Sequence, residues 1–209
     1  MPYLRPLPRL RVHAATAALV ALLLVVSFLP ESTWVMDRPV HPTSVQPLTR
    51  PSGETFCTSF SINEATGLWA TARHCVSSSE FALAGGYGEV VYRDIYWDMA
   101  VVQTAYRAPA IPLAGSSLQM GQAVVMYGYP KGSPVLIRTQ GHVAGLLVPI
   151  PGAAYSTMFD LTGAGGNSGS PIVRNGSLVA VMWGKSTNSE HVLGVPFDAM
   201  VRVLGPFMR

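Results

Sequence analysis

Charged residues are scarce in this chain: only 12% of its 209 residues are Asp, Glu, Lys or Arg, whereas 49% are hydrophobic. A disordered tail or a basic stripe that binds nucleic acid needs a much higher charge density, so neither class is expected. The net charge of +3 lies before residue 53, where five arginines face two acids, and the rest of the chain balances nine basic against nine acidic residues. The length fits one globular domain with a short appendage.

The first thirteen residues lack acids, and the next sixteen lack charge altogether. Residues 1–13 contain three arginines, and Ala14–Leu29 is interrupted only by Thr16 and Ser27. A basic flank before an apolar run is typical of an export signal whose flank stays in the cytoplasm. As a helix the run covers about 24 Å, less than the ~30 Å hydrocarbon core, and no clear small-residue cleavage site follows it. Residues 1–29 are therefore interpreted as an uncleaved signal anchor; a cleaved signal peptide and a buried core helix are the alternatives.

An uncleaved anchor makes a single-pass membrane protein with an extracytoplasmic domain, whereas cleavage makes a secreted one. Residues 30–52 contain five prolines and no apolar periodicity, which predicts a stiff, extended linker. The folded domain is expected at residues 53–209.

From residue 55 the chain consists of short runs rich in Val, Ile, Tyr, Trp and Phe, separated by Gly, Pro, Ser and Asn turns. This pattern predicts an all-β sandwich or barrel. Only residues 197–204 have helical spacing, which predicts a short C-terminal helix packed on the barrel. The expected strands are Thr55–Ile62, Leu68–Ala72, Glu89–Arg93, Met99–Gln103, Ala123–Tyr127, Ile137–Leu147, Tyr155–Leu161, Pro171–Val173 and Leu178–Trp183.

Cysteine is nearly absent, since Cys57 and Cys75 are the only two. An even count in an exported chain favours one disulfide, and two reduced core cysteines are the alternative. A zinc site is not favoured because no second Cys/His pair has ligand spacing, and no metal or other cofactor is expected.

A turn of small residues, Gly-Gly-Asn-Ser-Gly-Ser-Pro from Gly165 to Pro171, lies between two expected strands. Such a turn exposes the Ser168 hydroxyl and leaves the amides of Gly166 and Ser168 free to face a developing oxyanion. Because Gly, Asn, Ser and Pro are also the usual turn residues, this stretch alone is equally compatible with a plain turn.

A nucleophilic serine needs a base and an acid, and both lie upstream in the sequence. Thr-Ala-Arg-His-Cys delivers His74 at the end of an expected strand, and Trp-Asp-Met-Ala-Val places Asp98 at the start of another. Asp94 is an alternative acid, but no apolar run follows it. The order His, Asp, Ser is that of chymotrypsin, and a G-x-S-x-G elbow is excluded because Ser170 stands where the last glycine should be.

These three motifs resemble those of the chymotrypsin-fold, or trypsin-like, serine proteases, over roughly residues 53–205. Residues 127–130, 159–161 and 181–184 are most similar to the bacterial glutamyl-endopeptidase branch. The resemblance implies two six-stranded antiparallel β-barrels of the chymotrypsin type, a short C-terminal helix and a protein or peptide substrate. It implies that His74 is the general base, that Asp98 orients it and that Ser168 is the nucleophile.

Two departures from the resemblance bear on specificity and activation. Glutamyl endopeptidases are thought to recognise glutamate with a threonine and a histidine, where this chain has Gly163 and Met182. Asn167 precedes the serine where vertebrate digestive relatives carry an aspartate, so activation through an ion pair with a new N-terminus is not expected. No acid lies in residues 162–166 or 181–186, which argues against a trypsin-like preference.

A small, apolar pocket is therefore expected before the cleaved bond, selecting a small or medium uncharged residue. Lys185 keeps an acidic preference open. A catalytically inactive protease-fold binding protein and an esterase are the alternative functions. The remaining histidines, His13, His41, His142 and His191, stand beside no nucleophile or acid motif and are expected on the surface or in strands. The expected pocket residues are Gly163, Ala164, Met182, Trp183 and Gly184.

Overall fold

The computed structural model describes residues 38–77, 80–150, 153–187 and 189–209. The expected N-terminal hydrophobic helix and signal segment at residues 1–29 lie outside the described residues. Within these described ranges, no helix is long and apolar enough to cross a membrane.

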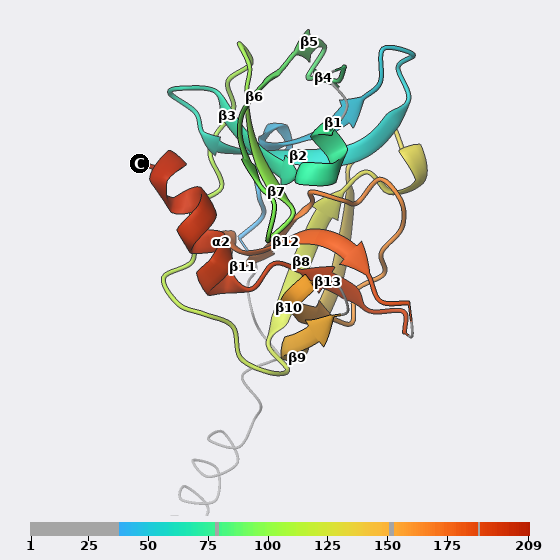
Figure 1. Ribbon diagram of the computed structural model, residues 1–209, viewed down its shortest axis with the longest axis vertical. Helices are drawn as coiled ribbons and strands as arrows, with labels where there is room; N and C mark the ends of the chain where they lie inside the picture. The colour runs from blue at the N-terminus through green and yellow to red at the C-terminus, as the bar shows by residue number, and fades with distance from the viewer. Residues whose placement is uncertain (1–37, 78–79, 151–152, 188) are drawn as a thin grey trace, which may run out of the picture. The chain divides into compact units, whose positions relative to one another are not determined.

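An antiparallel sheet of seven strands forms the first half of the folded unit, in the order β5-β4-β1-β2-β3-β7-β6. It is drawn in blue to green in Figure 1. Strands β2, β3, β6 and β7 coincide with expected ones to within one residue, and β2, β3 and β7 are buried along most of their length. The strands are β1 (Val45–Thr49), β2 (Thr55–Asn63), β3 (Leu68–Ala72), β4 (Ala82–Leu83), β5 (Gly86–Tyr87), β6 (Glu89–Asp94) and β7 (Met99–Gln103).

Strand β1 lies inside the segment that the sequence predicted to be a linker. It pairs with β2 on one side and β4 on the other, and Val45 and Leu48 are fully buried. Pro47 sits in the middle of the strand opposite Thr58. A proline within a short run argues against a strand, which is why the sequence pattern did not reveal β1. The ordered sheet therefore begins before residue 53.

The second half is a closed barrel of six antiparallel strands in the order β10-β13-β12-β11-β8-β9, closed by pairing of β10 with β9. Closure leaves no exposed strand edge. Its strands are β8 (Ala123–Gly128), β9 (Ile137–Ile150), β10 (Ala153–Phe159), β11 (Pro171–Arg174), β12 (Ser177–Lys185) and β13 (Val192–Gly194). The short strand β13 follows few pattern signals and was not expected.

The expectation of two six-stranded barrels is confirmed for this second half and needs correction for the first. The N-terminal sheet has seven strands and is open, with β5 at one edge and β6 at the other among the described residues. The physical reason is length, because β4 and β5 contain two residues each and form too short a ladder to close the sheet.

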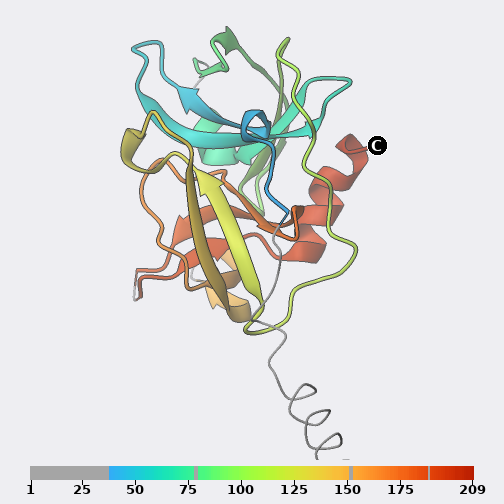
Figure 2. The same cartoon turned by 180° about the vertical axis from the view of Figure 1, so that it is seen from behind.

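One hydrophobic cluster joins the two halves, and each half has a further core of its own. The joining cluster includes Phe60 of β2, Val181 of β12 and Met200 of the helix α2 (Phe197–Leu204). Helix α2 is confirmed with the expected bounds, and both views show it beside the level at which sheet and barrel meet (Figures 1 and 2). This shared core holds the facing loops of the sheet and the barrel in place.

The disulfide between Cys57 and Cys75 is present and links β2 to the 3-10 turn η3 (Arg73–Val76). Both cysteines are buried, at 3% and 2% exposure. A bridge over this separation of 18 residues contributes about 3 kcal/mol on the loop-entropy model. It clamps the turn that carries His74.

Candidate active site

His74 and Asp98 meet where β3 ends and β7 begins. These strands pair with Ala72 opposite Met99, so the residues just beyond this pair are brought together. His74 Nδ1 lies 2.5 Å from Asp98 Oδ2, and the His74 backbone amide donates to Asp98 Oδ1 at 3.0 Å. Because both carboxylate oxygens are engaged, the imidazole is held with its other nitrogen, Nε2, directed elsewhere.

The backbone at Asp98 is itself unusual. Its φ is +50°, in the left-handed region that residues with a Cβ seldom occupy. The Asp98 carbonyl accepts a 2.8 Å hydrogen bond from the Arg73 amide, which holds the turn in this conformation. Backbone strain of this kind is common at functional sites.

The serine loop is anchored to the N-terminal sheet by main-chain contacts. The Ser168 carbonyl accepts from the Thr58 amide at 2.9 Å and lies 3.7 Å from Cys75 Sγ. The Gly166 carbonyl accepts from the Thr58 hydroxyl at 2.8 Å. Ser168 therefore lies against the disulfide at the residue next to His74, so sheet and barrel bring the three motifs together.

Glycine is required at two positions of this loop. A Cβ on Gly169 would lie 2.2 Å from the Thr58 carbonyl oxygen and 2.3 Å from the Thr71 hydroxyl, and a Cβ on Gly166 would lie 2.3 Å from the Tyr129 carbonyl oxygen. Both glycines have positive φ, +85° and +94°. Only glycine lets the loop approach the strand ends this closely.

The amides expected to face an oxyanion are unpaired. Within the part of the chain that the structure describes, neither the Gly166 N–H nor the Ser168 N–H has a hydrogen-bond acceptor. Unpaired backbone amides are uncommon in loops this well packed. Two free donors beside a half-buried serine form a place where developing negative charge can be stabilised.

Gly163, one of the expected pocket residues, is packed closely against nonpolar side chains. A Cβ on Gly163 would lie 2.5 Å from Val192 Cγ2 and 3.4 Å from Met182 Cε, whereas nothing lies within 4 Å of the equivalent point on Gly184. The surroundings of Gly163 are therefore nonpolar, and Gly184 faces open space. Val192 of β13 was missed from the sequence because it comes from a strand that was not expected.

Two other expected pocket residues, Ala164 and Trp183, make hydrogen bonds within the barrel half. Trp183 donates from Nε1 to the Ser156 hydroxyl at 3.1 Å, which fixes the indole across the barrel edge. The Ala164 carbonyl accepts from the Asn167 amide at 3.1 Å. Asn167 is buried, at 3% exposure, so an uncharged amide occupies the place just before the serine.

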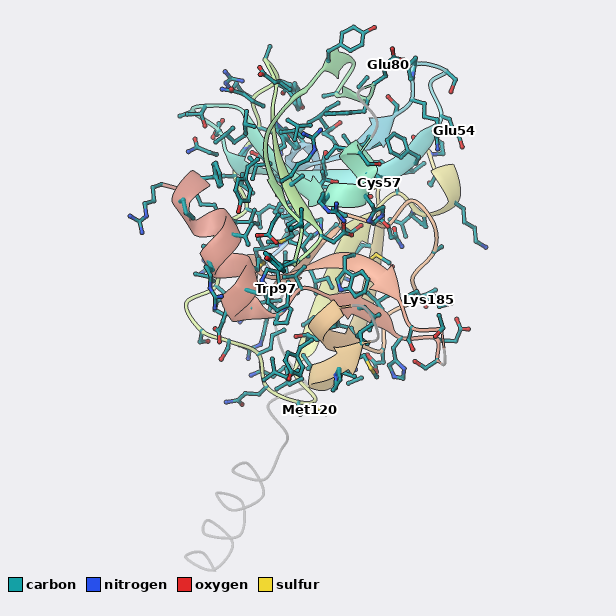
Figure 3. The ribbon with its side chains drawn as sticks, in the orientation of Figure 1. Glu54, Cys57, Glu80, Trp97, Met120 and Lys185 are labelled. Atoms are coloured by element: carbon teal, nitrogen blue, oxygen red, sulfur yellow. A yellow bond between two sulfur atoms is a disulfide. The ribbon has the colours of Figure 1, made fainter. Side chains whose placement is uncertain are left out.

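A groove of about 430 Å³ begins at His74 and runs past the neighbouring loop. Figure 3 labels Trp97, one of its lining residues, beside α2. The groove is lined by Arg73, His74, Ile95, Tyr96, Trp97, Asp98, Tyr155 and Trp183.

Asp94, the alternative acid, is used elsewhere. Its Oδ1 accepts from the amides of Tyr96 and Trp97 at 2.9 and 2.8 Å, which shapes the turn before Asp98. Of the other histidines in the described ranges, His142 pairs with Asp160 at 3.4 Å and His41 contacts Thr43 at 2.7 Å, whereas Nδ1 of His191 is buried without a hydrogen-bond partner. Cys57, His74 and Cys75 lie close enough to hold a metal, but both sulfurs belong to the disulfide and offer no thiolate.

The family model for the trypsin-like peptidase domain matches residues 57–181, which is more than half of the chain. The chain belongs to the trypsin-like peptidase family. The match contains the His74, Asp98 and Ser168 motifs and both cysteines. No curated protein sequence matches the chain significantly.

Solved structures share the fold of this trypsin-like peptidase at low sequence identity. Rv3671c from M. tuberculosis H37Rv, in an inactive form, superposes with a TM-score of 0.66 at 20% identity, covering 79% of this chain and 86% of that one. A serine endoprotease from Yersinia pestis gives 0.66 at 20% identity, over 80% and 64%. Deg5 gives 0.63 at 22% identity, over 80% and 90%. These likenesses confirm the chymotrypsin-type fold, and the glutamyl-endopeptidase branch stays a prediction.

Proposed function

We propose that this trypsin-like peptidase is an exported serine endopeptidase that uses Ser168, His74 and Asp98. The observation that supports it most directly is the His74 to Asp98 contact at 2.5 Å beside a serine loop with two unpaired amides. An orienting carboxylate, a base and a preorganised donor pair are the parts that acyl transfer needs. A catalytically inactive binding protein would not require the carboxylate, the base and the donor pair together.

In the proposed reaction His74 accepts the proton of the Ser168 hydroxyl as the serine oxygen attacks the scissile carbonyl. The amides of Gly166 and Ser168 stabilise the tetrahedral oxyanion, and Asp98 stabilises the imidazolium. The imidazolium then protonates the leaving amine, which breaks the peptide bond and leaves an acyl-enzyme. Water, deprotonated by His74, releases the acid product and restores the serine.

Export is proposed from the basic flank and apolar run of residues 1–29, with the segment retained as an anchor. The disulfide supports an oxidising compartment for the folded domain. The expected linker after the run would separate that domain from the membrane.

Labelling with a fluorophosphonate probe tests activity and anchoring together. In cells that express the full chain, we expect the probe to modify Ser168 in the membrane fraction, because an activated serine attacks the phosphorus. Ser170→Ala is the matched control, since that hydroxyl is buried two residues away and should leave labelling intact. An unlabelled, correctly folded protein would contradict the proposal, and a labelled protein that cleaves esters but no peptide would point to an esterase.

The nonpolar surroundings of Gly163 support a preference for cleavage after a small or medium uncharged residue. Gly163 has Val192 and Met182 at short range, and neither side chain offers a partner for a charge. A peptide library varied at the residue before the cleaved bond measures this preference. Val192→Ala should shift it toward larger side chains, and cleavage chiefly after Glu, Lys or Arg would show that the pocket is misassigned.

A further inference from the structure

The groove beside His74 is lined by large hydrophobic side chains together with Arg73, His74 and Asp98. Ile95 and Tyr96 are exposed at 67% and 77%, and Tyr155 at 49%, although all three are large hydrophobic residues. Such a concentration of exposed apolar side chains marks a binding surface. Arg73 is the basic side chain among the groove residues apart from the His74 imidazole.

Arg73 makes one ionic contact and keeps part of its guanidinium accessible. Its Nε is buried, lies 3.5 Å from Asp98 Oδ1 and makes no hydrogen bond within the described residues. Both Asp98 oxygens already accept hydrogen bonds from His74, and Asp94 caps the neighbouring turn. The Arg73 side chain is 39% exposed and lines the groove, so its two Nη groups can donate to a ligand there.

The position of the groove assigns it to the part of the substrate that is N-terminal to the cleaved bond. Trp183 lines the groove and also belongs to the proposed pocket for the residue before that bond. Ser168, which the scissile carbonyl must contact, does not line it. A substrate that follows the groove from His74 past Trp183 therefore leads away from the bond toward its own N-terminus.

We propose that Arg73 binds a carboxylate side chain on the substrate residue immediately N-terminal to the one in the Gly163 pocket. This inference rests on the proposed peptidase function and adds its substrate class: acidic segments followed by a small uncharged residue. A guanidinium matches the geometry of a carboxylate with two parallel N–H donors. Apolar residues further toward the substrate's N-terminus pack against Tyr96, Trp97 and Tyr155.

A peptide library varied at that second position tests the proposal with the wild-type enzyme alone. We expect Asp or Glu to be preferred over Asn or Gln by about fivefold in kcat/KM, the range for a half-exposed charged pair. The preference should weaken as salt is raised from 0.05 M to 0.5 M, because screening acts on exposed charges. Equal cleavage of acidic and amide substrates at low salt would overturn the proposal.

Variants show whether Arg73 is the group responsible. Arg73→Met should abolish the preference through KM, and Arg73→Lys should keep part of it. Lys185→Met is the matched control because it also removes one positive charge. The Lys185 ammonium lies on β12 and pairs with Glu190 instead of lining the groove. Figure 3 shows Lys185 well apart from Trp97. A preference that survives Arg73→Met, or that Lys185→Met removes, would assign it to another group.

A role for Arg73 confined to positioning Asp98 predicts a different result. In that case Arg73→Met lowers kcat for acidic and neutral substrates alike, with no change in their ratio, and the recognition proposal fails. Failure of the proposed peptidase function would look different. A wild-type protein that neither reacts with the fluorophosphonate probe nor cleaves any library member would refute both the peptidase function and the role of Arg73. Labelling rates of each variant also show whether its active site is still assembled.

Discussion

Ser168→Ala is expected to lower peptide turnover by about 10⁶, the largest effect of any single change in this chain. The substitution removes the hydroxyl proposed as the nucleophile, on the loop that also carries the unpaired amides of Gly166 and Ser168. It removes no packing of consequence, because the loop is held by main-chain bonds from Thr58 and by the glycines. The free energy of unfolding should therefore remain nearly unchanged.

Steady-state hydrolysis of the best library peptide and thermal unfolding, measured on the same preparations, check both halves of this expectation. His74→Ala should match Ser168→Ala in turnover, and the double variant should be no worse than either, because the two groups act as a unit. Ser170→Ala again serves as the control. Turnover within tenfold of wild type in pure Ser168→Ala protein would show that another residue is the nucleophile.

Asp98→Asn should reduce kcat by about 10⁴ while leaving the fold intact. An asparagine can occupy the same space and accept from the His74 amide through its oxygen. Its NH₂ group, however, cannot accept a hydrogen bond from the His74 Nδ1–H, which now donates to Asp98 Oδ2 with the two heavy atoms 2.5 Å apart. The imidazole then adopts the wrong tautomer and the imidazolium loses its counter-charge, so proton transfer from Ser168 fails.

Asp94→Asn is the matched control for this prediction. Asp94 is four residues upstream, carries the same charge and accepts two backbone hydrogen bonds, which an amide oxygen can also accept. Its kcat should stay within a few-fold of wild type. If Asp94→Asn were the more damaging of the two, measured as kcat on the same peptide, the acid would be Asp94 and the assignment of Asp98 would be refuted.

The elements predicted most accurately from the sequence are runs of apolar residues with turn residues on both sides. β3, β7 and α2 were expected with the bounds they have, and β3 and β7 are buried almost throughout. β1 was hidden by Pro47, and β13 is three residues long, too short to show a period. Each is held by pairing with two strands, β2 and β4 for β1, and β12 and β10 for β13, which no local pattern records.

The candidate site shows the same division. His74, Asp98 and Ser168 could be proposed from short motifs, because each needs small or turn-forming neighbours within a few residues. Val192 and the direction of the Arg73 donors could not, since they depend on which side chains from distant elements meet. The glycine at position 169 could have indicated that another part of the chain approaches closely there, but not that the partners are Thr58 and Thr71.

The sequence by itself determined that the folded part of this protein is β-rich, has one possible disulfide pair and carries the three motifs of a serine peptidase in chymotrypsin order. Outside the N-terminal segment the few charges balance, so the composition gave no reason to expect a nucleic-acid partner. Only the tertiary structure decided that the first sheet stays open while the second closes, that Gly163 lies against Val192 and Met182, and that Arg73 lines a groove. The physical reason is that strand closure, close packing and the lining of a groove depend on contacts between residues far apart in the chain, whereas motifs and periodicity report only on near neighbours.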